Sequence, residues 1–208
     1  MKKLLNPLVV SAFILVLMFG TLAHLMYGGC QTSKWHYIAQ KYWIPKNMPK
    51  WMWESDRNMY EKFTIDDDYT GVWRDWYENG IISSRSVYLN GTYHGAHEMW
   101  FENGNTNFKV NYSNGVQFGK SQMWHENGIK NMEVVWGKTK QLSMSEWDIK
   151  GKFIFMSKYD KKSKQYTSTY FKEDLIIKKE YFDINDDFLK RELFEKGKVV
   201  KVEFKEFP

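Results

Sequence analysis

The hydrophobic and polar positions of this chain follow two different patterns. Residues 8–29 are one apolar stretch without Asp, Glu, Lys or Arg. A helix rises about 1.5 Å per residue, so these 22 residues span roughly 33 Å, enough to cross a hydrocarbon core of about 30 Å. A cleavable signal peptide usually has a shorter apolar region. The sequence therefore predicts one transmembrane or signal helix within residues 1–30.

From about residue 71 onward, apolar and polar residues alternate in short runs. Phe108, Val110 and Tyr112 alternate with Lys109 and Asn111, which is the period of two expected for a half-buried strand. Asn-Gly pairs separate these runs and supply the positive φ angles that tight turns need, so the pattern predicts consecutive β-hairpins. The pairs are Asn79–Gly80, Asn90–Gly91, Asn103–Gly104, Asn114–Gly115 and Asn127–Gly128.

These runs belong to an internal repeat. The motif Trp-aromatic-Glu-Asn-Gly begins at Trp76, Trp100 and Trp124, and its copies are 24 residues apart. A glycine precedes each copy at one fixed offset, and steps of 23 residues continue the turn position beyond Gly128. The preceding glycines are Gly71, Gly95 and Gly119, and the later turn positions are Gly151, Asp174 and Gly197. Trp147, Tyr170 and Leu193 continue the tryptophan column, and Tyr88, Tyr112, Trp136, Tyr159 and Phe182 form a second aromatic column.

Two columns in step over six copies predict an all-β fold. We expect residues 71–208 to form a single-layer antiparallel meander of about six repeated β-hairpins, with an aromatic ladder along one face. One hairpin alone is marginal in water, so stability should come from contacts between neighbouring copies.

Residues 31–70 do not share the repeat. They are rich in aromatic residues and contain Pro45 and Pro49. Two interpretations stay open, a linker or a cap over the first strand edge of the array. The many aromatics favour the cap, because a solvated linker does not need them.

Composition and charge exclude several classes of protein. The 30 basic and 25 acidic residues are interleaved, whereas a nucleic-acid-binding protein gathers its positive charge into one patch. Cys30 is the only cysteine, so no intramolecular disulfide and no cysteine-rich zinc site can form. We therefore expect no nucleic acid among the partners.

The N-terminus predicts where the repeats are located. Lys2 and Lys3 favour a cytoplasmic N-terminus, which sends the repeats across the membrane to the periplasm or cell surface. Residues Met26–Cys30 also resemble a bacterial lipoprotein cleavage site, although Tyr27 replaces the usual aliphatic residue. Cys30 is therefore a lipidation candidate. A retained signal anchor, lipoprotein processing, and cleavage with release all stay open, and the first two keep the protein on the membrane.

The repeat motif resembles the bacterial variant of the MORN repeat. The resemblance is close over residues 71–137 and degenerate over 138–208. It implies a single-layer hairpin meander and an association with membranes and scaffolds, and bacterial members are often described as antitoxin components of toxin–antitoxin systems. The matching residues are structural, so the resemblance implies no catalytic role.

A second resemblance is to cell-wall-binding repeats, which hold choline or glucan between aromatic rings. Aromatic faces can stack on sugars or hold cations. The aromatic columns are therefore the candidate ligand-binding positions, with core packing as the alternative interpretation. The candidate residues are Trp76, Trp100, Trp124, Tyr88, Tyr112 and Trp136.

Other polar groups have structural interpretations. Glu78, Glu102 and Glu126 occupy equivalent turn positions, whereas a catalytic pair needs two different environments. His94 and His97 should point to opposite faces of a strand, and residues 66–68 lack the spacing of a calcium loop. We therefore expect no enzyme, no cofactor and no metal site.

The prediction is a non-enzymatic, membrane-tethered repeat protein that binds or scaffolds a protein partner, with toxin neutralisation as one version. The alternative is a carbohydrate- or cell-wall-binding module.

Overall fold

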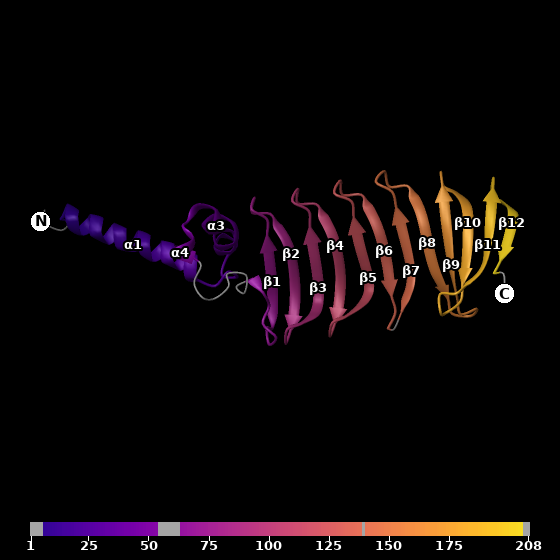
Figure 1. Cartoon of the computed structure of the whole chain (residues 1–208), viewed down its shortest axis with the longest axis horizontal. Helices are drawn as coiled ribbons and strands as arrows, with labels where there is room; N and C mark the ends of the chain where they lie inside the picture. The colour runs from indigo at the N-terminus through magenta and orange to yellow at the C-terminus, as the bar shows by residue number, and fades with distance from the viewer. Residues whose placement is uncertain (1–5, 54–62, 139, 206–208) are drawn as a thin grey trace, which may run out of the picture.

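The computed structural model describes residues 6–53, 63–138 and 140–205. A long helix, α1, begins the described chain, and four short helical segments follow it (Figure 1). These elements are α1 (Pro7–Tyr27), α2 (Lys34–Ile38), the π-helical turn η1 (Ala39–Trp43), α3 (Ile44–Asn47) and α4 (Lys50–Trp53).

Twelve antiparallel strands follow in one sheet, and their order in space is their order in sequence (Figure 1). This confirms the predicted single-layer meander, because twelve consecutive strands make six hairpins. The strands are β1 (Gly71–Trp76), β2 (Ile82–Leu89), β3 (Thr92–Trp100), β4 (Thr106–Ser113), β5 (Val116–Trp124), β6 (Lys130–Trp136), β7 (Gln141–Trp147), β8 (Phe153–Asp160), β9 (Gln165–Lys172), β10 (Leu175–Phe182), β11 (Phe188–Glu195) and β12 (Lys198–Phe204).

The glycine at a fixed offset lies directly across the sheet from an aromatic ring. Gly71 pairs with Tyr88, and Gly95 pairs with Tyr112. Gly119 pairs with Trp136 in the same way. All three glycines have a positive φ, which a residue without a Cβ atom adopts without strain.

We call the turns closed by backbone bonds between residues 77 and 81, 101 and 105, and 125 and 129 the early wide turns. In each of them an asparagine side chain bonds both within its own turn and to the turn of the next copy. The Asn79 side chain accepts a hydrogen bond from the Ile81 N–H at 2.9 Å and donates one to the Glu102 carbonyl at 3.1 Å. Asn103 donates to the Glu126 carbonyl at 2.9 Å, and Asn127 repeats the pattern. The turns therefore form a ladder of side-chain-to-backbone hydrogen bonds along one border of the sheet.

The wide turn changes sides in the fifth copy, which corrects the predicted continuation of the tryptophan column. Residues 173 and 174 form a two-residue turn with φ of 52° and 63°, so Tyr170 lies within β9 and not beside a wide turn. The next wide turn is Asp183–Asp187, at the opposite border, where the Asp183 N–H donates to the Asp187 carbonyl. A strand irregularity precedes Phe182, as one precedes Trp147 in the fourth copy. Phe182 is therefore the residue equivalent to Trp147 in this part of the sheet.

The rings that contact one another are mostly not the predicted tryptophans. Trp76 lies on β1 and Trp100 on β3, so two strand spacings of about 4.8 Å each separate them. This separation is larger than the distance over which two rings contact each other. Contact needs a ring on the strand between. Tyr93 on β3 supplies one, with its ring centroid 4.7 Å from that of Tyr88 on β2 and 5.0 Å from that of Tyr112 on β4. The aromatic ladder is therefore made of tyrosines in this part of the sheet.

The short helices lie against the first edge of the sheet. The Gln31 side chain bonds to both backbone groups of Arg74 on β1, donating to its carbonyl at 2.8 Å and accepting from its N–H at 3.1 Å. The hydroxyl of the fully buried Tyr37 donates to Asp75 at 2.8 Å, and that of Tyr42 donates to the Trp76 carbonyl at 2.9 Å. We call residues 31–53 the helical cap.

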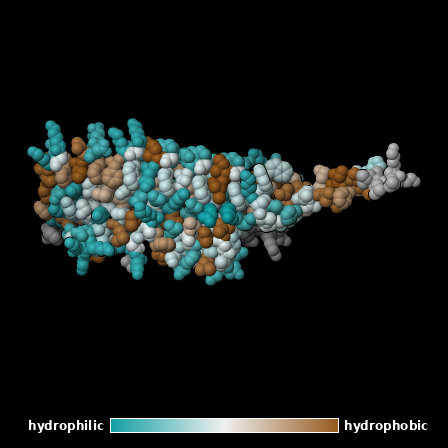
Figure 2. Space-filling model, turned by 180° about the vertical axis from the view of Figure 1, so that it is seen from behind, coloured by the Kyte–Doolittle hydropathy of each residue, from teal (hydrophilic) through white to brown (hydrophobic). Residues whose placement is uncertain are grey.

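Helix α1 is long and apolar enough to cross a membrane, and its most apolar window has no buried residue. Figure 2 shows its hydrophobic surface set apart from the mixed surface of the sheet. The cap holds its C-terminal end, because the Gln40 side chain donates to the carbonyls of Leu25 and Gly28 at 2.9 and 2.7 Å.

The turn ladder predicts a specific loss of stability for Asn103→Ala. This change removes the bond to Glu126 and the bond accepted from the Asn105 N–H, so the free energy of unfolding should fall by about 1–2 kcal/mol. Chemical denaturation of the full chain measures it. The matched control is Asn111→Ala, an exposed strand position of the same hairpin, and equal losses in both variants would contradict the ladder.

Candidate interaction surfaces

Most of the buried side chains of the sheet lie on one face, which we call the inner face; Thr169 on β9 is buried on the other. Directly paired residues share a face of a sheet, and a row of such residues crosses the middle of the strands. It begins with small or apolar side chains, such as Ser86, Val110 and Val134, which are buried, and it ends with charged ones. The row comprises Trp73, Ser86, His97, Val110, Ser121, Val134, Met144, Ser157, Ser168, Glu180, Arg191 and Glu203.

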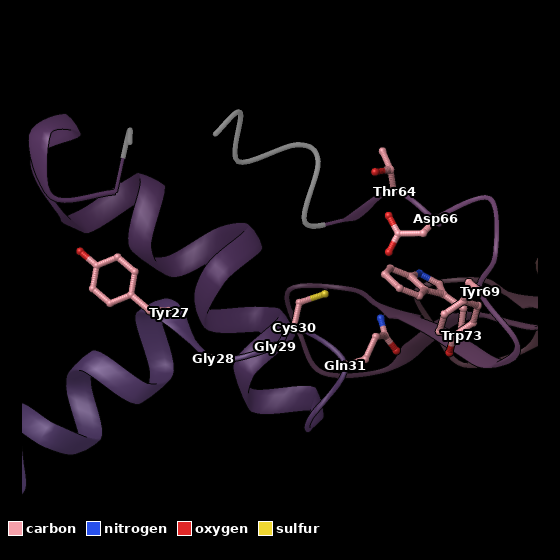
Figure 3. A pocket seen from close by; sticks show the side chains of 9 residues that line it. All are labelled: Tyr27, Gly28, Gly29, Cys30, Gln31, Thr64, Asp66, Tyr69 and Trp73. Atoms are coloured by element: carbon pink, nitrogen blue, oxygen red, sulfur yellow. The ribbon is translucent and has the colours of Figure 1, made fainter. Parts of the chain in front are cut away.

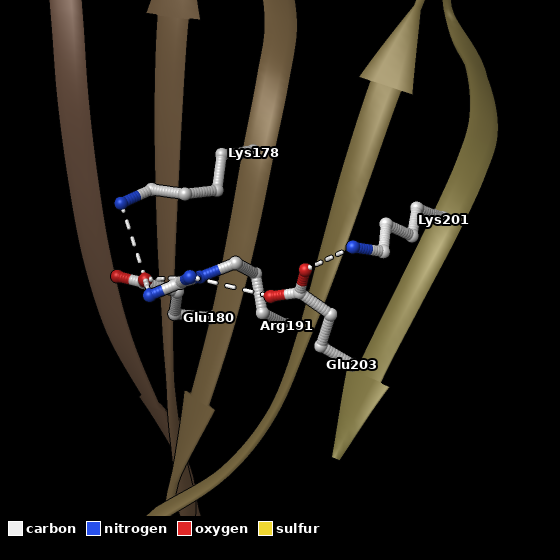
Figure 4. A network of polar contacts seen from close by, with 5 residues as sticks. All are labelled: Lys178, Glu180, Arg191, Lys201 and Glu203. Atoms are coloured by element: carbon white, nitrogen blue, oxygen red, sulfur yellow. Dashed lines mark hydrogen bonds and ion pairs between the residues drawn. The ribbon is translucent and has the colours of Figure 1, made fainter.

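The charged end of this row is a connected network over β10–β12 (Figure 4). Glu180 is 3.1 Å from Lys178 and 2.7 Å from Arg191, which also reaches Glu203 at 3.3 Å. Lys201 completes the network at 2.8 Å from Glu203. Burial opposes ionisation of Glu180, but hydrogen bonds from Lys178, Tyr170 and Arg191 outweigh it and lower its pKa. Three cations surround two carboxylates, so this end of the inner face carries net positive charge.

The opposite, outer face carries smaller networks. Glu133 on β6 lies 2.9 Å from Lys130 and 3.3 Å from Lys120, and it accepts a hydrogen bond from Gln122 at 2.9 Å. The hydrogen bond from Lys130 is the largest cause that lowers the pKa of Glu133 from 4.5 to about 2. These pairs hold neighbouring strands together on a face that has no covering layer.

The six predicted ligand residues lie in different environments. Trp76 packs against the cap, with its ring centroid 5.1 Å from that of Tyr37. Tyr88 is buried, and the Trp136 indole donates to the Ser121 hydroxyl at 3.0 Å. Trp100 and Trp124 are half-buried beside their turns, and Tyr112 stacks on Tyr93. The structure does not bring the six together, and their role in binding stays a prediction.

A pocket of about 390 Å³ lies where α1, the cap and the sheet meet (Figure 3). Cys30 and Gln31 line it from the cap side, and Tyr69 and Trp73 line it from the sheet side. Cys30 is only 7% exposed and belongs to a core cluster with Trp73 and Tyr88. Lipidation of Cys30 stays a prediction.

The last strand leaves a free edge that the sequence reasoning did not anticipate. Within the described chain, β12 pairs with β11 alone. The Lys205 N–H donates to the Leu189 carbonyl at 3.0 Å. Backbone groups alternate along a strand, so those of Val202 and Phe204 point away from β11. Both side chains are exposed, Phe204 by 69%. Val199, Val200 and Val202, which flank Lys201, were the available sequence signal.

The remaining polar candidates have structural partners. Glu102 and Glu126 lie in turns where their backbone carbonyls accept hydrogen bonds from the preceding copies. His97 lies 2.7 Å from the Ser86 hydroxyl, whereas His94 lies 3.2 Å from Asn114. No group of three His, Cys, Asp or Glu residues close enough to hold a metal occurs within the described ranges.

No protein-family model matches this chain, and no curated protein is similar to it. One matching solved structure is the crystal structure of accessory secretory protein 1,2 and 3 in Streptococcus pneumoniae, with 12% identity and a TM-score of 0.28. The match covers 62% of this chain and 27% of that chain, so this chain spans about a quarter of its length. At this TM-score the likeness carries no argument.

The Glu133 network predicts a dependence of stability on pH. A folded-state pKa of about 2, below the ordinary 4.5, means that ionisation of Glu133 stabilises the fold. This contribution is fully present above about pH 5 and disappears as the pH falls through about 2. The difference in Tm between the wild type and Glu133→Gln should therefore shrink over that window. Glu126→Gln, at an exposed turn, is the matched control, and a difference for Glu133→Gln that is constant with pH would contradict the assignment.

Proposed function

We propose that this protein is a non-enzymatic interaction module of the bacterial envelope, held on the membrane by α1 and presenting its repeat array outside the cytoplasm. The free edge of β12 is the observation that carries the interaction role. The lysines at positions 2 and 3 support the outward orientation.

The contacts between α1 and the cap support retention of α1 as a signal anchor. Gln40 is buried, and its amide N–H groups bond only to α1 and the residue after it, at Leu25 and Gly28. Cleavage before Cys30 would remove both acceptors together with the helix that contacts Gln40, so these two bonds exist only in the retained chain. The structure of the cap thus favours the retained helix over lipoprotein processing.

The free edge of β12 is suited to β-augmentation, in which an extended segment of a partner adds a further strand to the sheet. The strand and the residue after it carry three lysines, at positions 198, 201 and 205, against one acidic residue, Glu203. Two copies of this strand would repel each other, since like charges destabilise strand pairs. The partner we propose is therefore an extended, acidic segment of a different polypeptide, which also matches the net positive end of the inner face.

Membership of the bacterial MORN-repeat variants, with toxin neutralisation as the narrower role, is part of this proposal and rests on the repeat motif alone. The carbohydrate-binding alternative has less support from the geometry. The ring faces of Tyr88, Tyr93 and Tyr112 pack on one another, so they offer fewer open faces for stacking a sugar.

The anchor is tested by the intact mass of the membrane-extracted protein. We expect a chain that retains residues 1–29, because Gln40 depends on them. A chain that begins at Cys30 with added acyl mass, and that loses this mass in Cys30→Ser, would show a lipoprotein instead.

The free edge is tested by crosslinking in the native membrane. We replace Phe204 with the photoreactive analogue p-benzoylphenylalanine and expect a protein adduct at this position. The same replacement at Phe118, an exposed outer-face residue of β5, is the matched control and should give none.

A second pair of variants tests the strand-addition mode. Val202→Pro removes an outward N–H without breaking the pairing with β11, since proline is tolerated on edge strands. It should abolish the Phe204 adduct, whereas Val202→Thr, which keeps the N–H, should preserve it. An adduct that survives Val202→Pro would overturn β-augmentation, and equal adducts at both analogue positions would overturn the edge as the binding surface.

A further inference from the structure

The cap has an aromatic surface on the side that faces α1, away from the sheet. Trp51 on α4 is 80% exposed, Trp43 on η1 is 48% exposed, and Tyr27 at the end of α1 is 64% exposed. Trp73 on the sheet side and Tyr37 in the cap, by contrast, are buried. Trp35 on α2 is also exposed, by 64%, but it lies beside Lys34, whose ammonium group is near Gly80 in the first wide turn.

The contacts of the cap place these rings near the C-terminal end of α1. The Tyr27 hydroxyl donates to the carbonyl of Met52 at 2.9 Å, which fixes α4 and its Trp51 beside α1 (Figure 1). His36 and Gln40 are four residues apart on one face of the helical segments, and Trp43 follows Gln40 at the end of the π-helical turn η1. That face meets α1, because the rings of His36 and His24 are 4.8 Å apart and Gln40 bonds to the Leu25 carbonyl.

The sheet-facing side of the same helices has a different composition. Tyr37 and Tyr42 bond to β1 and its end, and Lys46 lies 3.4 Å from Glu78 in the first wide turn. One side of the cap is therefore bonded to the array, whereas Trp43 and Trp51 are left exposed in the segments that contact α1 or follow them.

We infer that Tyr27, Trp43 and Trp51 form an interfacial belt that lies in the headgroup layer of the same bilayer that α1 crosses. Trp and Tyr are enriched at this depth, because each has an apolar body and a polar tip. The exposed Lys50, next to Trp51, adds attraction to anionic headgroups. The inference rests on the proposed membrane anchoring, since α1 sets the depth of the belt.

The belt gives the anchor a second point of attachment. A single helix alone lets an attached domain tilt and rotate, whereas interfacial aromatic residues help to set its tilt. Because the cap bonds directly to β1 through Gln31, fixing the cap against the bilayer also fixes the direction in which the array leaves the membrane.

Lipid quenching of tryptophan fluorescence tests the belt. The full chain is reconstituted into vesicles of phosphatidylcholine and phosphatidylglycerol, with or without lipid brominated in the upper part of its acyl chains. Trp43 and Trp51 are two of ten tryptophans, so brominated lipid should reduce the emission by about a fifth. The double variant Trp43→Phe, Trp51→Phe should lose most of this quenching.

The matched control is Trp100→Phe, Trp124→Phe, which removes two tryptophans of the array and should increase the quenched fraction. Flotation of the same vesicles separates the two proposals. Protein that does not float with lipid would show that the anchoring proposal is wrong. Protein that floats but is quenched equally in the wild type and the cap variant would overturn the belt alone, and would point to a protein partner over these rings.

Discussion

A single layer of strands has no opposing layer, so each hairpin has to bury its side chains against the next hairpin. The contacts that cross from copy to copy follow from this constraint. Asparagine side chains of the early wide turns bond to the backbone of the following turn. Tyrosines on successive strands stack on one another, and glycines face the larger rings. The regular spacing of the motif is the spacing at which these contacts can be repeated.

The same constraint explains how far the fold could be predicted. Asn-Gly pairs and period-two alternation are local signals, and they were sufficient for the meander and for its early turns. Stepping forward by a constant number of residues placed turns correctly at Asp174 and Gly197 but missed the change of turn type, because Glu173 and Asp174 form a two-residue turn in the left-handed conformation without a glycine. Tyr88 and Tyr112 of the tyrosine ladder belong to the predicted second column, but Tyr93 between them belongs to neither column, and only the pairing of β2 with β3 brings it beside Tyr88.

The surfaces were less predictable than the sheet. The two hydrogen bonds from Gln31 to Arg74 join residues far apart in sequence, and a glutamine has no signature for pairing with a strand edge. The charged network over β10–β12 depends on cross-strand pairing, and interleaved charges in the sequence indicated only a soluble surface. The second aromatic column included rings that pack on a neighbour, Tyr88 and Tyr112, but the columns could not distinguish a buried ring from an open one.

Among the described residues, the cap lies against β1 at one end of the array, and β12 pairs with β11 alone at the other. Adding or deleting one hairpin within it would leave both ends unchanged, because each copy contacts only its neighbours. Each hairpin adds two strand spacings, or about 10 Å. The number of copies therefore sets a distance: duplication of a single repeat would place β12 one increment further from the cap without altering the first or the last strand of the sheet.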